Sequence, residues 1–339
     1  MEQLFSNSEV RKIYCPDLAR QTLINAEKRK DIPKSTMVKI GNKDVRKWPL
    51  SAMPVIGNKY GFLKGKVLSP QCVAIYTAKG GVLKTTLCYS IARIFALHGF
   101  KVLLIGLDVQ CSITELAINP LLPFTELKDV KVLKGLYDFL KEDSELKLSD
   151  IIEETSLPTL HIVPETPALS RLERLIRLQP RSEYILSKKV LEPLKGEYDF
   201  IFMDNGPGWN SIVENSLTGA DVVLSPVGCD LQSFQAIDEN MESTFAFKQN
   251  MDLEWKKFIL IPTLLANTKL SKQIYSAYTE KFPDYVSECS IRRTVRGEES
   301  LTHGISIIEH EPGTPLSNDY VALSKEIFGL LPVSQENIN

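Results

Sequence analysis

The sequence predicts an α/β protein with a doubly wound, mostly parallel sheet and a small, mainly helical head at the N-terminus. From Gln71 onward, short apolar runs alternate with amphipathic stretches, as in β–α–β units. The 339 residues exceed one average domain and allow a large α/β domain with an appendage. Charge divides the chain at the same place, because residues 1–70 hold 14 Lys and Arg against 6 Asp and Glu, and residues 71–339 hold 26 against 36. We therefore expect a basic head with its connector over residues 1–70 and the sheet domain over residues 71–339.

Strands are expected where apolar residues run together between turn signals, over Cys72–Thr77, Lys101–Leu107, Leu160–Pro164, Tyr198–Met203, Asp221–Pro226 and Phe258–Pro262. Amphipathic periodicity predicts helices over Thr85–His98, Leu133–Leu140, Leu169–Leu178, Glu183–Leu194, Leu231–Phe247, Lys269–Phe282 and Ser317–Leu330. In the head, a helix is expected from an N-cap at Asp17 to Lys30, followed by a basic hairpin over Lys39–Trp48. The prolines and glycines of Trp48–Pro70 predict a turn-rich connector.

Composition excludes several classes of protein. Apolar residues make up 43% of the chain and charged residues 24%, which are globular proportions and exclude disorder for most of the chain. No apolar run reaches the roughly 18 residues of a membrane helix, and the start of the chain lacks the order of a secretion signal, so a soluble, cytoplasmic protein is expected. The cysteines form no CxxC pair and the histidines show no metal-ligand spacing, which argues against a disulfide framework, a zinc ribbon or an iron–sulfur site.

A glycine-containing loop between the first predicted strand and helix carries the strongest functional signal. Backbone N–H groups at such a helix start point toward bound anions, and the helix dipole adds a favourable potential. The ammonium of Lys84 is expected to neutralise β- and γ-phosphates, and the hydroxyl of Thr85 to bind Mg²⁺. The residues expected to hold the nucleotide here are Lys79, Gly80, Gly81, Val82, Leu83, Lys84, Thr85 and Thr86.

The segment KGGVLKTT, which begins at Lys79, resembles the deviant Walker A motif, KGGxGKTT, of the ParA/MinD family of ATPases. The resemblance extends over about residues 71–332 and implies ATP and Mg²⁺ as cofactors. It also implies that Lys79 reaches the phosphates of a partner subunit, so that ATP binding and homodimer formation are linked. Leu83 departs from the motif, because a Cβ at the glycine position can clash with phosphates or oppose the required backbone angles. Three alternatives remain open: the leucine side chain points away from the nucleotide, ATP binds but turns over poorly, or the site is inactive.

Two further segments resemble carboxylate motifs of the same family. The run from Gly106 to Gln110 is similar to DxDPQ, with glycine in place of the first aspartate, and this implies that Asp108 positions the attacking water. Capping of the next helix is the alternative role for Asp108. The run from Tyr198 to Gly208 resembles the Walker B strand and predicts that Asp204 joins the Mg²⁺ shell. The resulting sets are Lys79, Lys84 and Asp108 as catalytic residues, Thr85 and Asp204 at the metal, and Pro262 at the edge where adenine is expected.

Weaker resemblances concern DNA. The run from Ile291 to Gly304 is similar to the family stretch IPRxVRxxExxxxG, which implies that Arg296 contacts DNA without sequence preference, with Arg293 close by. Arginine suits this role because its planar fork grips phosphate oxygens at two points. Asn267 replaces the arginine of the family element RTxLS, which leaves Lys269 and Lys272 as candidate substitutes. A solvated loop is the alternative for the arginines.

The basic head admits more than one interpretation. The helix expected up to Lys30, with the Ile32–Pro33 stop and the basic hairpin after it, resembles the head of MerR-type helix-turn-helix proteins. The positive charge of residues 1–70 predicts a head that binds a polyanion such as DNA through release of counterions, and the resemblance adds recognition of a specific sequence as one interpretation. The alternatives are a solvated basic tail and a dimerisation arm that docks on the ATPase domain.

These resemblances together imply a ParA-like, weak Mg-dependent ATPase that forms an ATP-dependent sandwich dimer and binds DNA non-specifically. Such a protein partitions or positions plasmid or chromosomal DNA, or another cargo, with a ParB-like or adaptor protein as partner. It is expected in the bacterial cytoplasm on the nucleoid. Membrane binding is disfavoured because the final residues lack a basic amphipathic helix. The alternative is a DNA-binding transcriptional regulator that uses a degenerate nucleotide site as a switch without significant hydrolysis.

Overall fold

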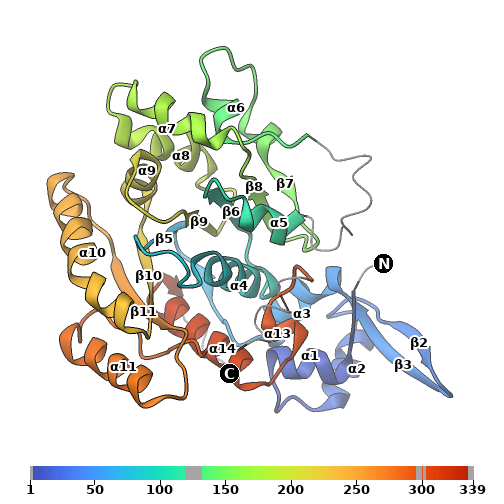
Figure 1. The fold of residues 1–339 in the computed structure, drawn as a ribbon. Helices are drawn as coiled ribbons and strands as arrows, with labels where there is room; N and C mark the ends of the chain where they lie inside the picture. Colours follow the sequence, from blue (N-terminus) through green and yellow to red (C-terminus); the bar gives the residue numbers. More distant parts are fainter. Residues whose placement is uncertain (1–2, 119–131, 295–299, 301–302, 335–339) are drawn as a thin grey trace.

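A seven-stranded sheet with the order β11-β10-β5-β9-β6-β8-β7 forms the centre of the molecule (Figure 1). The computed structural model describes residues 3–118, 132–294, 300 and 303–334. Strands pair in parallel except at β7–β8. The strands are β5 (Gln71–Ile75), β6 (Val102–Leu107), β7 (Glu153–Glu154), β8 (Leu160–Val163), β9 (Phe200–Asn205), β10 (Val222–Gly228) and β11 (Lys257–Thr263). The strand order reverses beside β5, and ligands of open α/β sheets bind at such a reversal.

Helices cover both faces of the sheet. Except in the two-residue strand β7, residues of each strand alternate between two apolar clusters, so that Val73 faces one and Cys72 the other. The first cluster includes residues of α4 (Lys84–Leu97), α5 (Ser112–Ile118), α13 (Ile307–His310) and α14 (Pro315–Gly329). The second includes residues of α6 (Leu136–Leu140), η3 (Leu148–Ile151), α7 (Leu169–Arg177), η5 (Ser187–Leu191), α8 (Glu192–Leu194), α9 (Ser211–Gly219), α10 (Leu231–Asn250) and α11 (Lys269–Lys281). None of the helices in the described part of the chain combines the length and apolar character needed to cross a bilayer.

The fold class predicted from the sequence is confirmed, and every expected strand forms. The helix expected over Glu183–Leu194 forms without a break in the backbone, but its hydrogen bonding changes along its length, from η4 (Ser182–Tyr184) through the π-type turn η5 to the short α8. Helix α9 was not anticipated. Its start is marked by Asn210, whose side chain accepts hydrogen bonds from the backbone N–H groups of Ile212 and Val213 at 3.0 and 2.9 Å.

The N-terminal region contains helices and a three-stranded antiparallel sheet of order β1-β3-β2. Its elements are β1 (Leu4–Ser6), α1 (Asn7–Tyr14), α2 (Arg20–Lys28), β2 (Thr36–Ile40), β3 (Lys43–Pro49), η1 (Leu50–Ala52) and α3 (Met53–Tyr60). The expected basic hairpin forms between β2 and β3. The expected N-cap at Asp17 is wrong, because α2 begins at Arg20 after Ala19, which has no side-chain cap.

The turn-rich connector expected over Trp48–Pro70 is also wrong. Helix α3 occupies the middle of this segment, where Pro54 lies in the first helical turn, a position that proline tolerates. The indole of Trp48 is fully buried and donates to the carbonyl oxygen of Pro33 at 3.1 Å. The segment ends with β4 (Lys66–Val67), which pairs with β12 (Val333–Ser334). Residues 48–67 therefore join the head to the rest of the molecule through buried contacts.

The head packs directly on helix α4, as Figure 1 shows for α3 and the C-terminal end of α4. The hydroxyl of Tyr14 lies 2.7 Å from the carbonyl oxygen of Met53 and 2.9 Å from that of Leu97. A Cβ on Gly57 would lie 2.0 Å from the carbonyl oxygen of Leu97, so only glycine permits this approach of α3 to α4. Buried head residues such as Ile13 belong to the same apolar cluster as Leu87 and Val73. One continuous core therefore includes the head and one face of the sheet.

Helix α4 is buried from Leu87 to Leu97, and this burial includes one charged side chain, that of Arg93. The guanidinium of Arg93 donates to both carboxylate oxygens of Glu309, at 2.6 and 2.9 Å, and both side chains are 0% exposed. Burial alone would lower the pKa of Arg93, but the Glu309 carboxylate raises it, so the guanidinium stays charged. The pair links α4 to α13.

We predict that Glu309→Gln destabilises the protein strongly, because it leaves the buried guanidinium of Arg93 without a counterion. The expected loss in free energy of unfolding is about 3–5 kcal/mol. Urea denaturation followed by circular dichroism measures it. The matched control is Lys188→Ala, which removes the exposed ion pair with Glu192 and should change stability by less than about 1 kcal/mol. Equal effects of the two substitutions would contradict the assignment.

Candidate nucleotide-binding site

The loop between β5 and α4 forms an open cradle of backbone amides. Gly81 has a φ of +72°, and nothing lies within 4 Å of the position that a Cβ would take on Gly80 or Gly81. Helix α4 begins at Lys84, and the first N–H groups of a helix have no intrahelical partner. Thr85 and Thr86 lie half-buried in this first turn, whereas Val82 is buried. The loop can therefore accept a bound anion against its backbone.

Leu83 meets the backbone requirement of the motif despite its side chain. Its φ of 66° and ψ of 29° lie in the left-handed region that glycine normally supplies. The Leu83 side chain is half-buried and packs against the apolar cluster that contains Leu87, and its carbonyl oxygen accepts from the Leu87 amide at 2.8 Å. This placement favours the first of the three alternatives, in which the side chain points away from the nucleotide.

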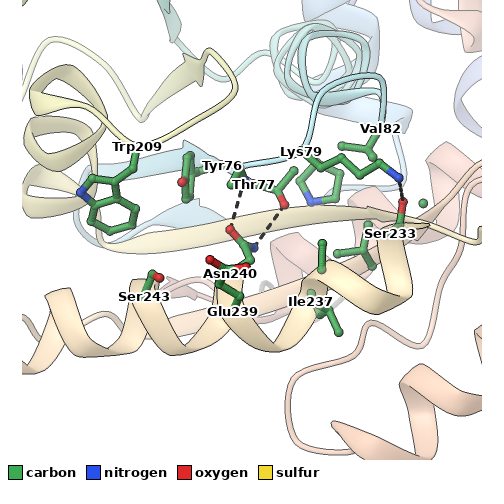
Figure 2. A pocket seen from close by; sticks show the side chains of 15 residues that line it. Tyr76, Thr77, Lys79, Val82, Trp209, Ser233, Ile237, Glu239, Asn240 and Ser243 are labelled. Atoms are coloured by element: carbon green, nitrogen blue, oxygen red, sulfur yellow. Dashed lines mark hydrogen bonds between the residues drawn. The ribbon is translucent and has the colours of Figure 1, made fainter. Parts of the chain in front are cut away.

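The two lysines of the loop lie in different environments. The ammonium of Lys84 is buried and donates to the carbonyl oxygen of Lys79 at 2.7 Å. Burial lowers the pKa of Lys84, while the carboxylates of Asp204 and Asp108 raise it. The ammonium of Lys79 instead contacts the start of α10. It lies 3.1 Å from the carboxylate of Asp230, and it donates to the hydroxyl of Ser233 at 2.9 Å (Figure 2).

Helix α10 also holds the start of the loop, which the sequence did not indicate. The side-chain oxygen of Asn240 accepts from the Ala78 amide at 3.1 Å, and its nitrogen donates to the Thr77 hydroxyl at 3.2 Å (Figure 2). A pocket beside these contacts is lined by Tyr76, Trp209 and Ile237, among other residues. Only the three-residue N-cap spacing of Asp230 and Ser233 could have drawn attention to this helix start in the sequence.

Asp204 is the penultimate residue of β9 and lies beside the cradle, where the Walker B resemblance expects it. It is 0% exposed, and neither carboxylate oxygen has a hydrogen-bond partner of good geometry among the described residues. Burial raises the pKa of Asp204 well above its usual range, opposed by the nearby Thr85 hydroxyl and Lys84 ammonium. A buried carboxylate without partners is costly, and Mg²⁺ prefers oxygen ligands of this kind. The donor set of Asp204 and Thr85 therefore fits a magnesium ion.

Asp108 follows the end of β6, next to β9. Its carboxylate lies against Gly206, where a Cβ would be 3.2 Å from the Asp108 Cγ atom. The Oδ1 atom accepts from the Gln110 amide at 3.0 Å, inside its own turn and ahead of α5. The structure thus brings Asp108, Asp204 and Lys84 to one edge of the sheet.

Pro262 is buried near the end of β11, and its carbonyl oxygen accepts from the Ile291 amide at 2.9 Å. The hydroxyl of the adjacent Thr263 donates to the carbonyl oxygen of Val82 at 3.1 Å. These bonds join the end of β11 to the cradle. The contact with adenine stays a prediction.

The residues predicted to bind DNA gather beyond the same strand. Lys269 and Lys272 are exposed in the first two turns of α11. Arg293 is exposed as well, and its amide donates to the carbonyl oxygen of Leu265 at 3.0 Å, beside the loop that leads into α11. Arg292 is held by Asp319 through contacts of 2.6 and 2.8 Å. Arg296 lies outside the described residues.

The mostly parallel sheet, the amide cradle after its inner strand β5 and the carboxylate near the end of the neighbouring strand β9 define a P-loop nucleoside triphosphatase. A family model described as an AAA domain matches residues 70–256. The sporulation initiation inhibitor protein Soj of Bacillus subtilis (strain 168) is 31% identical over 260 residues, which are 76% of this chain and 98% of Soj. The chain therefore belongs to the ParA/MinD-type family of P-loop ATPases.

Solved structures show the same fold. A complex of Cyanothece McdA with ATP has a TM-score of 0.66 at 19% identity and covers 78% of this chain and 99% of its own. A structure named partition protein has a TM-score of 0.67 at 16% identity, over 97% of this chain and 92% of its own. The alignment with this second structure therefore includes most of the head as well as the sheet.

We predict that replacing Leu83 changes stability but not nucleotide affinity, because its side chain packs on the core. Leu83→Ala keeps the positive φ and loses packing, and should lower the free energy of unfolding by about 1–3 kcal/mol. Leu83→Gly should be less destabilising, because it also relieves about 1–2 kcal/mol of backbone strain. Titration calorimetry with ATP should give dissociation constants within about threefold of the unmodified chain for both variants, which is under about 1 kcal/mol. A tenfold tighter complex of Leu83→Gly would show that the leucine hinders ATP.

Proposed function

We propose that this chain is a ParA-like ATPase that binds ATP and Mg²⁺ between two subunits and uses slow hydrolysis to position or segregate DNA or another cargo. One observation carries the proposal: the open amide cradle, the buried Lys84 ammonium and the buried Asp204 carboxylate lie together at one sheet edge. Membership of the ParA/MinD-type family supports it. A ParB-like or adaptor protein that stimulates hydrolysis, and a place on the bacterial nucleoid, belong to the same proposal.

Each residue of the site has a distinct part in this reaction. The backbone amides of Gly80 to Thr86 donate hydrogen bonds to phosphate oxygens, and the ammonium of Lys84 supplies positive charge to the β- and γ-phosphates. Mg²⁺, held by Thr85 and Asp204, would neutralise charge on the β- and γ-phosphates. Asp108 accepts a hydrogen bond from the attacking water and orients it toward the γ-phosphate. The carboxylate suits this part because it lies beside Asp204 without occupying the cradle.

Lys79 links the nucleotide to dimer formation in this proposal. Its ammonium leaves Asp230 and Ser233 and reaches the phosphates of the partner subunit. The Lys79 side chain is 29% exposed and that of Asp230 49%, and an ion pair so exposed contributes only about 0–1 kcal/mol. Release of Lys79 from α10 is therefore inexpensive compared with the interaction of an ammonium with a triphosphate in a site that excludes water.

DNA binding by the ATPase domain rests on the exposed cations at the end of β11. Lys269, Lys272 and Arg293 lie around one loop, although residues 71–339 carry an excess of acidic residues. Such contacts to phosphate give affinity without sequence preference. Arg296 is proposed to act with them.

The head favours a second candidate function, that of a DNA-binding regulator whose nucleotide site acts as a switch. Helices α1 and α2 are followed by the β2–β3 hairpin, and Lys28, Lys39 and Lys43 are exposed on α2 and the hairpin. A helix pair with a basic hairpin suits a groove and its flanking phosphates. Hydrolysis and sequence preference separate the two functions.

We predict that Asp108→Ala abolishes turnover while the ATP-dependent dimer persists. The carboxylate orients water and does not hold the phosphates, so the rate of phosphate release should fall by about 10²–10⁴-fold. Light scattering after chromatography in ATP and Mg²⁺ checks the dimer. Asp143→Ala, which removes an exposed carboxylate remote from the cradle in sequence, is the control and should hydrolyse ATP normally. Unchanged turnover in Asp108→Ala would remove this residue from the mechanism.

A second prediction separates the two DNA contacts in the full-length chain. The double variant Lys269→Ala/Lys272→Ala should weaken binding equally for all duplexes and reduce the salt dependence of log affinity by up to about 2. Lys39→Ala/Lys43→Ala should reduce the difference between sequences if the head reads a site. Fluorescence anisotropy across a salt series, with ATP present, measures both, and Lys188→Ala is the control. Binding of the unmodified chain that is absent, or independent of salt, would contradict both contacts.

A further inference from the structure

The side chain of Glu165, in the loop that follows β8, occupies the space where a side chain at Gly106 of β6 would lie. Gly106 stands near the end of β6, opposite Asp204 in the pairing with β9, where the resemblance to DxDPQ has an aspartate. Strand β8 pairs with β6 on its other side, and Glu165 comes two residues after β8 ends. A Cβ on residue 106 would lie 2.2 Å from the Cγ atom of Glu165 and 2.6 Å from its Cδ atom. A side chain at 106 and the observed position of Glu165 therefore exclude each other.

The carboxylate of Glu165 holds the segment that carries Asp108. Its Oε1 atom accepts from the Asp108 amide at 3.2 Å. Its Oε2 atom accepts from the Thr114 amide at 3.3 Å and from the Thr114 hydroxyl at 3.1 Å. The Glu165 amide donates back to the Thr114 hydroxyl at 2.8 Å. One side chain thus fixes both ends of the turn from Asp108 to Thr114.

This arrangement is costly for a residue that only fills space. Glu165 is 2% exposed, and burial raises the pKa of its carboxyl to about 7, although the hydrogen bonds from Thr114 and Asp108 oppose the rise. The carboxylates of Asp108 and Asp204 and the thiols of Cys88 and Cys111 face it through space. An apolar side chain at 165 with a larger residue at 106 would avoid this desolvation. The position therefore points to a role for the acceptor oxygens.

We propose that Glu165 is a positioning residue, which replaces from β8 the side chain missing at Gly106 and orients the Asp108 carboxylate by holding the Asp108–Thr114 segment. Glu165 acts through the Asp108 backbone and does not touch the nucleotide. The inference rests on the proposed function, because its kinetic readout is ATP hydrolysis. The mutual exclusion of side chains at 106 and 165 is independent of that function.

The kinetic test uses Glu165→Gln in the full-length chain, with Glu115→Gln on the exposed side of α5 as the control. The amide nitrogen of glutamine cannot accept, so at least one of the three donors loses its partner. We expect kcat to fall by about 10- to 100-fold, as for a misplaced catalytic group, while calorimetry gives an unchanged dissociation constant for ATP. The double variant Gly106→Asp/Glu165→Ala should recover most of kcat. A wild-type kcat in Glu165→Gln, or no recovery in the double variant, would overturn the proposal.

A stability cycle tests the exclusion without reference to hydrolysis. Gly106→Ala should lower the melting temperature markedly in the unmodified background, because the new Cβ meets Glu165. The same change should lower it much less in a Glu165→Ala background, and strictly additive shifts would overturn the proposal. If the unmodified chain binds ATP but never hydrolyses it, the proposed function fails. The stability cycle then still decides whether a side chain at position 106 and the Glu165 side chain exclude each other.

Discussion

The enclosure of helix α4 is the constraint on which the remaining structure depends. Its N-terminal turn supplies the cradle amides, and its C-terminal carbonyl at Leu97 receives the Tyr14 hydroxyl of the head. Between these ends Arg93 requires Glu309, because a guanidinium in the protein interior cannot remain unpaired. Tyr89, one turn earlier, donates to the carbonyl oxygen of Gly304 at 2.6 Å. A change in the cradle is thereby connected through one rigid element to both the head and the C-terminal helices.

The sheet and the phosphate-binding loop could largely be predicted from the sequence, because the patterns that determine them are local. Alternating apolar runs located every strand of the parallel sheet except the short edge strand β7, and the spacing of Lys79, Lys84 and Thr85 located the cradle. Two of the failures share a physical cause, since they depend on contacts between distant segments. Gly57 reads as a turn residue, yet it lies inside α3 and permits contact with α4. Glu165 gave no local signal, and only the missing aspartate at Gly106 pointed to an altered site.

Leu83 shows that the glycine position of this phosphate loop requires a left-handed backbone conformation more than it requires the absence of a side chain. The left-handed conformation costs a leucine about 1–2 kcal/mol. Full burial of such a side chain returns about 1.5–3 kcal/mol, and Leu83 is half-buried, so the two effects nearly cancel. The substitution is therefore compatible with both a stable fold and an accessible cradle. Leucine stands at the glycine position of the motif, and the left-handed backbone conformation of that position is retained.

The shared core of head and sheet has a geometric consequence. Because Trp48, Ile13 and Leu87 are buried in one cluster, the head cannot pivot on a flexible tether. Two copies related by a twofold axis would present their α2–hairpin surfaces at a single spacing and a single mutual angle. If the proposed dimer binds DNA through its heads, the distance between the two contacts along the duplex would be fixed. Inverted half-sites at one separation would fit it, and the same half-sites moved by half a helical turn would not.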